Sequence, residues 1–316
     1  MTKPVKKLPR LPAYFLTLNA KAAAIMTIRR IVSLICAVSS IAWLAHQDFH
    51  WFPAAIGYIS LSLWGGASFQ NLALIGHEAS HFNLHPNRMV SVVWGVLTSA
   101  LVPLHFDIGF SLEHLKHHRF ANSDKDPDTK VFQKFNNLFS RLFLARSAAS
   151  RSYLRLTWLV ATKRAVACER SKDYQLSCNQ LQFLARLNLV ASFVILVTYG
   201  LAIYYFPVTL GTGLAASYLG AVLLSGIRPY LEHGGTSHDC STVARTWETP
   251  LSGLIFGNIN YHHAHHLFPA VPAYRMGALQ KWLEQNGHIN DTAVKSSTYR
   301  QLWEVASKSQ YGITTR

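Results

Sequence analysis

The sequence predicts an all-α integral membrane protein in which four transmembrane helices form two hairpins and a cytosolic helical cap carries a histidine-rich site. Three observations lead to this fold class. Half of the 316 residues are hydrophobic and only 14% are charged, a balance typical of membrane proteins. Apolar runs of transmembrane length alternate with basic segments. The 16 histidines gather largely in three short clusters, which packing alone does not require.

Four apolar runs are close to the roughly 20 residues that a helix needs to cross a bilayer. They lie at about 25–45, 54–75, 187–206 and 208–227. The first is the weakest, because it spans the membrane only if Arg29 and Arg30 extend their side chains towards the surface. A further run at 89–110 would carry basic residues to the outer face if it crossed, so we predict a re-entrant or interfacial segment there.

The positions of the 30 Lys and Arg residues predict the topology. Neither 46–53 nor 206–213, the loops inside the two hairpins, contains a basic residue. Basic residues instead precede the first run, fill 119–172 and follow residue 228. By the positive-inside rule, both termini and the middle segment are expected in the cytosol. The net charge of +15 then faces anionic lipid headgroups, and no nucleic-acid partner is expected because no recognition motif accompanies it.

These patterns divide the chain into three regions. We predict a basic cytosolic arm at 1–24, a membrane domain at 25–275 and a cytosolic amphipathic tail at 276–316, with basic helices on the membrane surface or in solvent at 130–180. The four cysteines are scattered and form no CxxC pair. They are predicted to be reduced thiols without a structural role.

The histidine clusters follow the predicted spans and are the candidate functional residues. They consist of His77 and His81, of His114, His117 and His118, and of His262, His263, His265 and His266. Residues at i, i+3 and i+4 share one helix face, so each cluster can offer several ring nitrogens to a metal. His233 follows the last span at the level of the first cluster, and we predict that it joins them. Imidazole suits iron, copper and zinc alike, so spacing does not identify the metal.

Other polar residues are assigned simpler roles. His85, His238 and His288 are expected at the surface, and His105 with Asp107 are interpreted as surface polar groups rather than ligands. The alternating aspartates at 124–128 resemble a calcium loop. However, Thr129 and Phe135 stand where such a loop needs Gly and Glu, so a tight turn is predicted instead.

Two other functions compete with a polyhistidine metal centre, a zinc protease and a haem-carrying electron-transfer protein. Residues 77–81 match HExxH, in which two histidines bind zinc and the glutamate is the general base of a protease, but this leaves the other clusters without a role. In a polyhistidine centre Glu78 orients a ligating imidazole, and Glu232, Asn258 and Asn260 are further candidates to support the ligands. A haem-carrying electron-transfer protein would have histidine pairs within the spans rather than at their cytosolic ends.

The motifs HxxxH, HxxHH and HxxHH after membrane hairpins resemble the integral-membrane fatty acid desaturase and hydroxylase superfamily. The resemblance covers roughly 50–275 and is most specific at 113–122, 126–128 and 260–269. It implies a non-haem di-iron centre that uses O2 on the cytosolic side. The implied ligands are His77, His81, His114, His117, His118, His233, His262, His265 and His266. His263 falls where the family varies and is expected to be spare.

The resemblance also implies the reaction and its partners. The expected activity is introduction of a double bond into a fatty acyl chain carried on a lipid or acyl carrier. Because the short HxxxH motif also occurs in relatives that hydroxylate, the alternative is a hydroxylase, ketolase or acetylenase acting on a lipid, carotenoid or small amphiphile. The sequence shows neither a CxxC pair nor a Gly-rich dinucleotide motif, so a separate electron donor of ferredoxin or cytochrome b5 type is expected.

Overall fold

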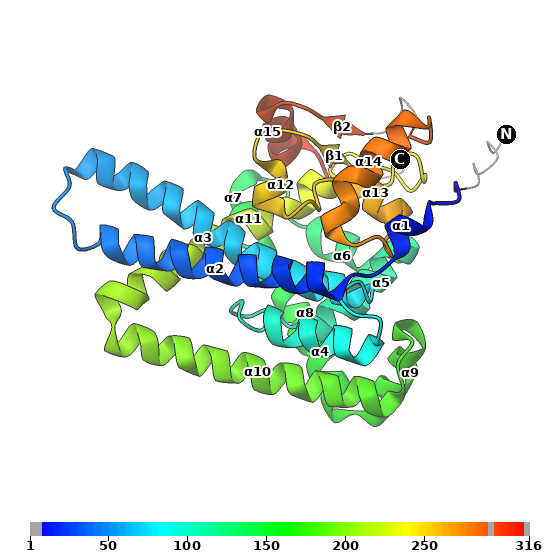
Figure 1. The fold of residues 1–316 in the computed structure, drawn as a ribbon, viewed down its shortest axis with the longest axis horizontal. Helices are drawn as coiled ribbons and strands as arrows, with labels where there is room; N and C mark the ends of the chain where they lie inside the picture. The colour runs from blue at the N-terminus through cyan, green and yellow to red at the C-terminus, as the bar shows by residue number, and fades with distance from the viewer. Residues whose placement is uncertain (1–7, 290–293, 313–316) are drawn as a thin grey trace.

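The computed structural model describes residues 8–289 and 294–312, so the first seven residues of the predicted arm and the last four of the predicted tail lie outside it. Figure 1 shows long helices that project from a group of shorter ones. The long helices are α2 (Ala20–Leu44), α3 (Trp51–Ser80), α10 (Cys178–Tyr205) and α11 (Thr212–His233). α2 runs antiparallel beside α3, and the turns of both hairpins lie far from the short helices.

The shorter elements gather at one end of the long helices, and their arrangement as a cytosolic cap stays a prediction. They are α1 (Ala13–Leu16), α4 (Arg88–Ser99), α5 (Asp107–Phe120), α6 (Pro127–Phe132), α7 (Leu138–Phe143), α8 (Ala145–Thr162), α9 (Arg164–Tyr174), α12 (Ser252–Phe256), α13 (His262–Leu267), η2 (Ala273–Arg275), α14 (Met276–Gln285) and α15 (Tyr299–Lys308). A short parallel pair, β1 (Thr246–Trp247) with β2 (Lys295–Ser296), adds the strand content that the all-α prediction lacked.

Three described helices are long and apolar enough to cross a membrane: α2, α10 and the continuous helix Pro207–His233, in which the π-helical turn η1 (Pro207–Gly211) precedes α11. They coincide with three of the four predicted spans. α3 is 30 residues long but is not among them, and its second half carries polar residues such as Gln70 and Asn71. The four-helix count is therefore not confirmed.

α3 packs along both α2 and α11, which places its histidine end beside the end of α11. Glycines make the contact with α11 close, because a Cβ added to Gly66 would collide with the backbone of Gly220. Small residues at such crossings let two helix backbones touch. α2 approaches α3 through Arg30, which is 8% exposed and donates to the Asn71 carbonyl at 2.7 Å. The guanidinium of Arg30 is therefore held against the neighbouring helix, and whether it reaches the membrane surface stays a prediction.

α10 differs from the other long helices because most of its surface has no protein cover. Its first half packs on α4, α8 and α9, while Phe193 and Tyr204 in the second half are 68% and 76% exposed. Such an apolar surface is expected to contact lipid. α4, the core of the predicted interfacial segment, has 12 residues and is about 18 Å long, too short to cross the hydrocarbon. Its interfacial placement stays a prediction.

The cysteine prediction is wrong for one pair. Cys168 of α9 and Cys178, the first residue of α10, form a disulfide. The chain reverses between them through Gln175, which has the left-handed φ of 51°, and Ser177 then caps α10, so the two Cα atoms lie 4.5 Å apart. No short sequence motif indicates this disulfide, because the two cysteines are ten residues apart and meet only through the turn between α9 and α10. Cys36 and Cys240 are free and exposed, as predicted.

The described part of the tail contains α14 and α15 and also reaches the histidine region. Trp282 packs against Phe15 with ring centroids 6.0 Å apart, whereas Trp303 is 60% exposed. Beyond α15 the chain turns inward, where the Gly312 amide donates to the carbonyl of His233 at 2.9 Å. The tail therefore covers one side of the histidine region.

Candidate metal centre

Four structural elements deliver histidines to one place. His77 lies in the last turn of α3 and His81 follows that helix, while His233 is the last residue of α11. α5 carries the second predicted motif and α13 the third. Because α3 and α11 pack along each other, their histidine ends meet at one level. The nine predicted ligands lie in two groups, each with its ring nitrogens within 4.8 Å of one another.

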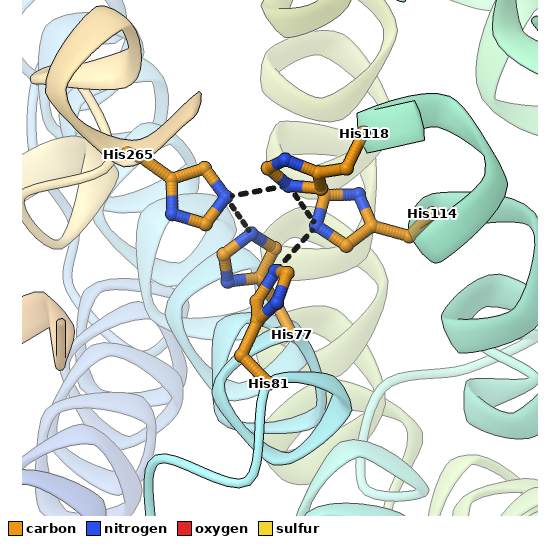
Figure 2. A group of neighbouring side chains, drawn as sticks. All are labelled: His77, His81, His114, His118 and His265. Carbon is orange, nitrogen blue, oxygen red and sulfur yellow. Dashed lines mark hydrogen bonds between the residues drawn. The ribbon is translucent and has the colours of Figure 1, made fainter. Parts of the chain in front are cut away.

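The first cluster joins His77, His81, His114, His118 and His265. Figure 2 shows their rings pointing towards a common centre from α3, α5 and α13. Neighbouring Nε2 atoms lie 2.9 to 3.1 Å apart, as between His118 and His265 and between His77 and His265. Ligand nitrogens at about 2.1 Å from one metal ion would be about 3 Å from their neighbours, so the spacing suits a shared ion.

The second cluster joins His117, His233, His262 and His266. The Nε2 atom of His233 lies 3.1 Å from those of His117 and His262, and the Nε2 atoms of His262 and His266 are 3.2 Å apart. The second and third histidine motifs each divide between the clusters, whereas His77 and His81 both belong to the first. On α13 the i, i+4 pair His262 and His266 faces the second cluster, while His265 faces the first.

The hydrogen bonds on the outer ring atoms show that the second cluster suits a cation. The Nδ1 atom of His117 lies 3.0 Å from both oxygens of Asp126, and that of His233 lies 3.1 Å from the Val243 carbonyl. Carboxylates and carbonyls only accept, so both Nδ1 atoms donate. The two neutral rings would then present lone pairs to each other at 3.1 Å, an arrangement that requires a proton or a metal ion between them.

The electrostatics of the cap agree with this requirement. Burial holds the pKa of His114 and His265 well below the usual value and lowers the pKa of His81 to about 3, so these rings are neutral and their lone pairs are available to a metal. Burial also acts to lower the pKa of His117, but the charge and hydrogen bond of Asp126 outweigh it and raise the pKa to about 9. The carboxylate of Asp126 thus favours positive charge at His117.

Glu78 lies beside the first cluster and faces away from its centre. One oxygen is 3.1 Å from His77 Nδ1, and the other accepts from the Ala273 amide at 2.7 Å. The carboxylate thus fixes one imidazole and ties α3 to the segment after α13, as expected for a residue that orients a ligand. In a zinc protease the same glutamate would have to face a metal-bound water.

The comparisons with known proteins agree with this geometry. The sequence pattern of the fatty acid desaturase family matches residues 49–296, a range that contains all nine clustered histidines. The chain belongs to the fatty acid desaturase family. The resemblance inferred from the three histidine motifs is therefore confirmed, and the family match continues past residue 275 to the end of the described tail strand. The family and the three apolar helices together indicate a membrane protein.

Similar proteins include sphingolipid desaturases from animals. The sphingolipid delta(4)-desaturase DES1 of Drosophila melanogaster is 27% identical over 232 residues, which is 69% of this chain and 63% of that protein. The enzyme of Xenopus tropicalis is 25% identical over 262 residues, covering 79% and 72% of the two chains, and that of Homo sapiens is 24% identical over 241 residues, covering 74% and 67%. The chain thus spans between 63% and 72% of the length of these relatives.

The other candidates for supporting roles lie in different places around this desaturase-family site. Glu232 pairs with Arg228 at 3.0 Å and lies 3.7 Å from His262 Nδ1, beside the second cluster. Asn260 donates to the Trp247 carbonyl at 2.8 Å and so fixes the segment before α13 to β1. Asn258 lines a groove between α2 and α3. Asn260 therefore supports the protein scaffold, and Asn258 lies away from the clusters. Glu232 is placed to support His262.

Among the histidines outside the two clusters, His105 does not lie where the sequence predicts. His105 and Asp107 are 3% and 0% exposed, so the expectation of surface polar groups is wrong. They lie 3.5 Å from each other, deep between helices, because the absence of a side chain at Gly76 admits the Asp107 carboxylate. His263 bonds to the Cys240 carbonyl at 3.0 Å, and His238 bonds to the Ala121 carbonyl at 2.8 Å.

Sequence reasoning missed several groups that touch the ligands. Asp126, interpreted as part of a tight turn, also accepts the His117 hydrogen bond, and the family resemblance at 126–128 was the available signal. The Val243 carbonyl supports His233 through its backbone, for which a sequence carries no signal. The Tyr311 ring lies 5.4 Å from that of His233, a contact that only the folded tail reveals.

A cavity of about 70 Å³ reaches both clusters. It touches His77 and His114 of the first cluster and His117, His233 and His262 of the second. This volume holds several water-sized groups.

The remaining wall of the cavity is mixed, with aromatic rings beside polar groups such as Arg146 and Arg228. Gln70 is 3% exposed, and neither its amide nitrogen nor its oxygen has a hydrogen-bond partner among the described residues. A small substrate segment with a polar group would therefore be accepted.

Proposed function

We propose that this protein is an O2-dependent membrane oxidoreductase that holds two irons in its histidine clusters and introduces a double bond into a fatty acyl chain. The observation that carries the proposal is the pair of buried, adjacent, all-histidine clusters that share one cavity. Nine imidazoles are too many for one ion and suit two. The family match and the sphingolipid desaturases among its relatives support the reaction class.

The reaction balances with one external reductant. A CH2–CH2 unit loses two hydrogens to become CH=CH, and O2 takes up these two hydrogens together with two electrons and two protons to leave two waters. The electrons come from a separate donor of ferredoxin or cytochrome b5 type, for which the basic cytosolic face is a suitable docking surface. Two irons bound by imidazole nitrogens supply an oxidant strong enough to take hydrogen from an unactivated methylene.

The protein's own residues perform the remaining tasks. The clusters hold the metal ions, and Glu78, Asp126 and the Val243 carbonyl orient three of the rings through Nδ1. The cavity beside both clusters positions the methylenes, and burial of the rings excludes bulk water from the oxidant. Which carbons react is then set by how the substrate fills the cavity.

The proposed membrane arrangement places α3 as the fourth span. Its 30 residues are about 45 Å long and run antiparallel to α2, whose hairpin turn contains no basic residue. Both termini and the histidine clusters then face the cytosol, and the acyl substrate reaches the cavity from the bilayer side. The substrate class is a lipid or acyl carrier. The unpartnered Gln70 amide favours a substrate with a polar group near the reacting carbons, as in the sphingolipids of the relatives.

Hydroxylation is the second candidate, because the same cavity and clusters would serve oxygen insertion, as would ketolase or acetylenase chemistry on a related amphiphile. The test is expression with a matching electron donor, followed by mass spectrometry of the host lipids. Desaturation gives products lighter by two hydrogens, and hydroxylation gives products heavier by one oxygen. Metal analysis accompanies the assay: two irons per chain support the proposal, while a single zinc and O2-independent proteolysis would replace it with the HExxH alternative.

A further inference from the structure

A second cavity lies on a different face of α3 from the metal centre. It is a groove of about 800 Å³ between α2, α3 and α12. Its walls are mostly apolar and include Ile25, Leu63, Trp64 and Leu254. The α3 residues that face this groove include Leu63, Trp64, Ala67 and Asn71, whereas Gln70, Ala73 and His77 face the metal cavity. α3 therefore separates the two, and a molecule in the groove does not reach the histidines.

Two arginines give this apolar groove a positive charge. Arg29 is exposed, and Arg30 is 8% exposed with one nitrogen bonded to the Asn71 carbonyl. Among the described residues no carboxylate lies within the 4.0 Å of an ion pair with either arginine. Glu78 acts on Arg30 only through its charge and is hydrogen-bonded elsewhere. A largely buried cation without a contacting anion is unfavourable, so the groove is complementary to an anionic group.

The groove lies at the depth where lipid headgroups are expected. The uninterrupted apolar part of α2 begins at Ile31, directly after the two arginines, which marks the boundary between headgroups and acyl chains. α12 forms the rim at the same level and exposes Leu251 by 64% and Leu254 by 75%. Exposed leucines beside an arginine pair are typical of a segment inserted into the membrane interface.

We propose that this groove binds one anionic phospholipid of the surrounding membrane. Its phosphate contacts Arg29 and Arg30, and one acyl chain lies along Leu63 and Trp64. Arginine suits this role because its planar guanidinium binds two phosphate oxygens at once. The lipid is a bound partner and not the substrate, since α3 stands between it and the metal cavity. The site goes beyond the proposed oxidation and does not require it.

The test is native mass spectrometry of the full-length protein after incubation with an equal mixture of phosphatidylglycerol and phosphatidylcholine. We expect one phosphatidylglycerol retained per chain. Arg30→Gln removes the central charge and is expected to weaken retention by about tenfold or more. Arg29→Gln weakens it while leaving the Arg30 contact with α3 intact, so the result does not depend on whether Arg30→Gln folds. Arg151→Gln, an exposed arginine on α8, is the matched control and retains lipid as the wild type does.

Fluorescence locates the bound lipid independently. Brominated phosphatidylglycerol is expected to quench the emission of Trp64, so the Trp64→Phe variant should show less quenching than the wild type. Equal retention of both lipids, or unchanged retention in Arg29→Gln and Arg30→Gln, would overturn the proposal, as would conversion of the retained lipid to product during turnover. Lipid retention is also measured on the metal-free protein, because binding in the groove does not require the metal ions. If the metal-loaded protein is inactive but still retains phosphatidylglycerol, only the proposed reaction is refuted.

Discussion

The two histidine clusters are built alike but supported differently. In the first, one carboxylate, Glu78, bonds to a ring through His77, and the outer nitrogen of His265 has no partner among the described residues. In the second, Asp126 and the Val243 carbonyl each fix a ring, and Glu232 lies 3.7 Å from the outer nitrogen of His262, which has no hydrogen-bond partner among the described residues. The first cluster therefore depends on ring packing and on a single hydrogen-bonding side chain, whereas the second distributes its support. The comparison predicts that the first cluster is the more sensitive to single substitutions.

The largest effect is expected from His265→Ala. This ring contacts both His77 and His118 in the first cluster, so its loss should abolish turnover and reduce the iron content from two per chain towards one. Iron analysis and the lipid assay measure the two effects. His263→Ala is the matched control, because this neighbour on the same helix bonds to Cys240 and belongs to neither cluster. Retained activity in His265→Ala, or loss in His263→Ala, would contradict the assignment.

The second prediction compares the two supporting carboxylates. Losing such a partner typically weakens metal binding by about 10- to 100-fold. Glu78→Gln is expected to cause a loss near the upper end of this range, because Glu78 is the only carboxylate among the described residues that bonds to its cluster, and it also accepts from the Ala273 amide. Asp126→Asn is expected near the lower end, because its cluster keeps the Val243 contact. Iron release to a chelator measures both. Equal losses, or a larger loss for Asp126→Asn, would refute the difference in support.

Which histidines gather at the site could be predicted from the sequence, but how they divide into two clusters could not. Histidines at helical spacing have few structural reasons to recur, so the three motifs were recognisable. That His265 faces one cluster while His262 and His266 face the other depends on how α13 crosses α5, which is a tertiary property. The sequence favours surface positions for His105 and Asp107, because these polar groups would be costly facing lipid. They are buried because Gly76 provides room that no local pattern shows.

The third prediction concerns the cavity that the clusters share. Gln70→Leu removes an amide that has no partner among the described residues, so the thermal stability should stay the same or rise. If that amide bonds to the substrate, the apparent KM should increase roughly two- to tenfold while the iron content is unchanged. Thermal unfolding and substrate titration separate the two effects. A stable variant with wild-type kinetics would show that the substrate presents no polar group to Gln70.

The smallest effect is expected where the tail meets the second cluster. The Tyr311 ring packs 5.4 Å from the His233 ring, but its hydroxyl is buried without a hydrogen-bond partner among the described residues. Tyr311→Phe keeps the packing and removes only the unsatisfied oxygen, so iron retention and turnover should remain within about twofold of wild type. Tyr311→Ala should release iron faster, because it removes the ring that packs on His233 and opens the second cluster to solvent. A large loss in Tyr311→Phe would instead place that hydroxyl in the reaction.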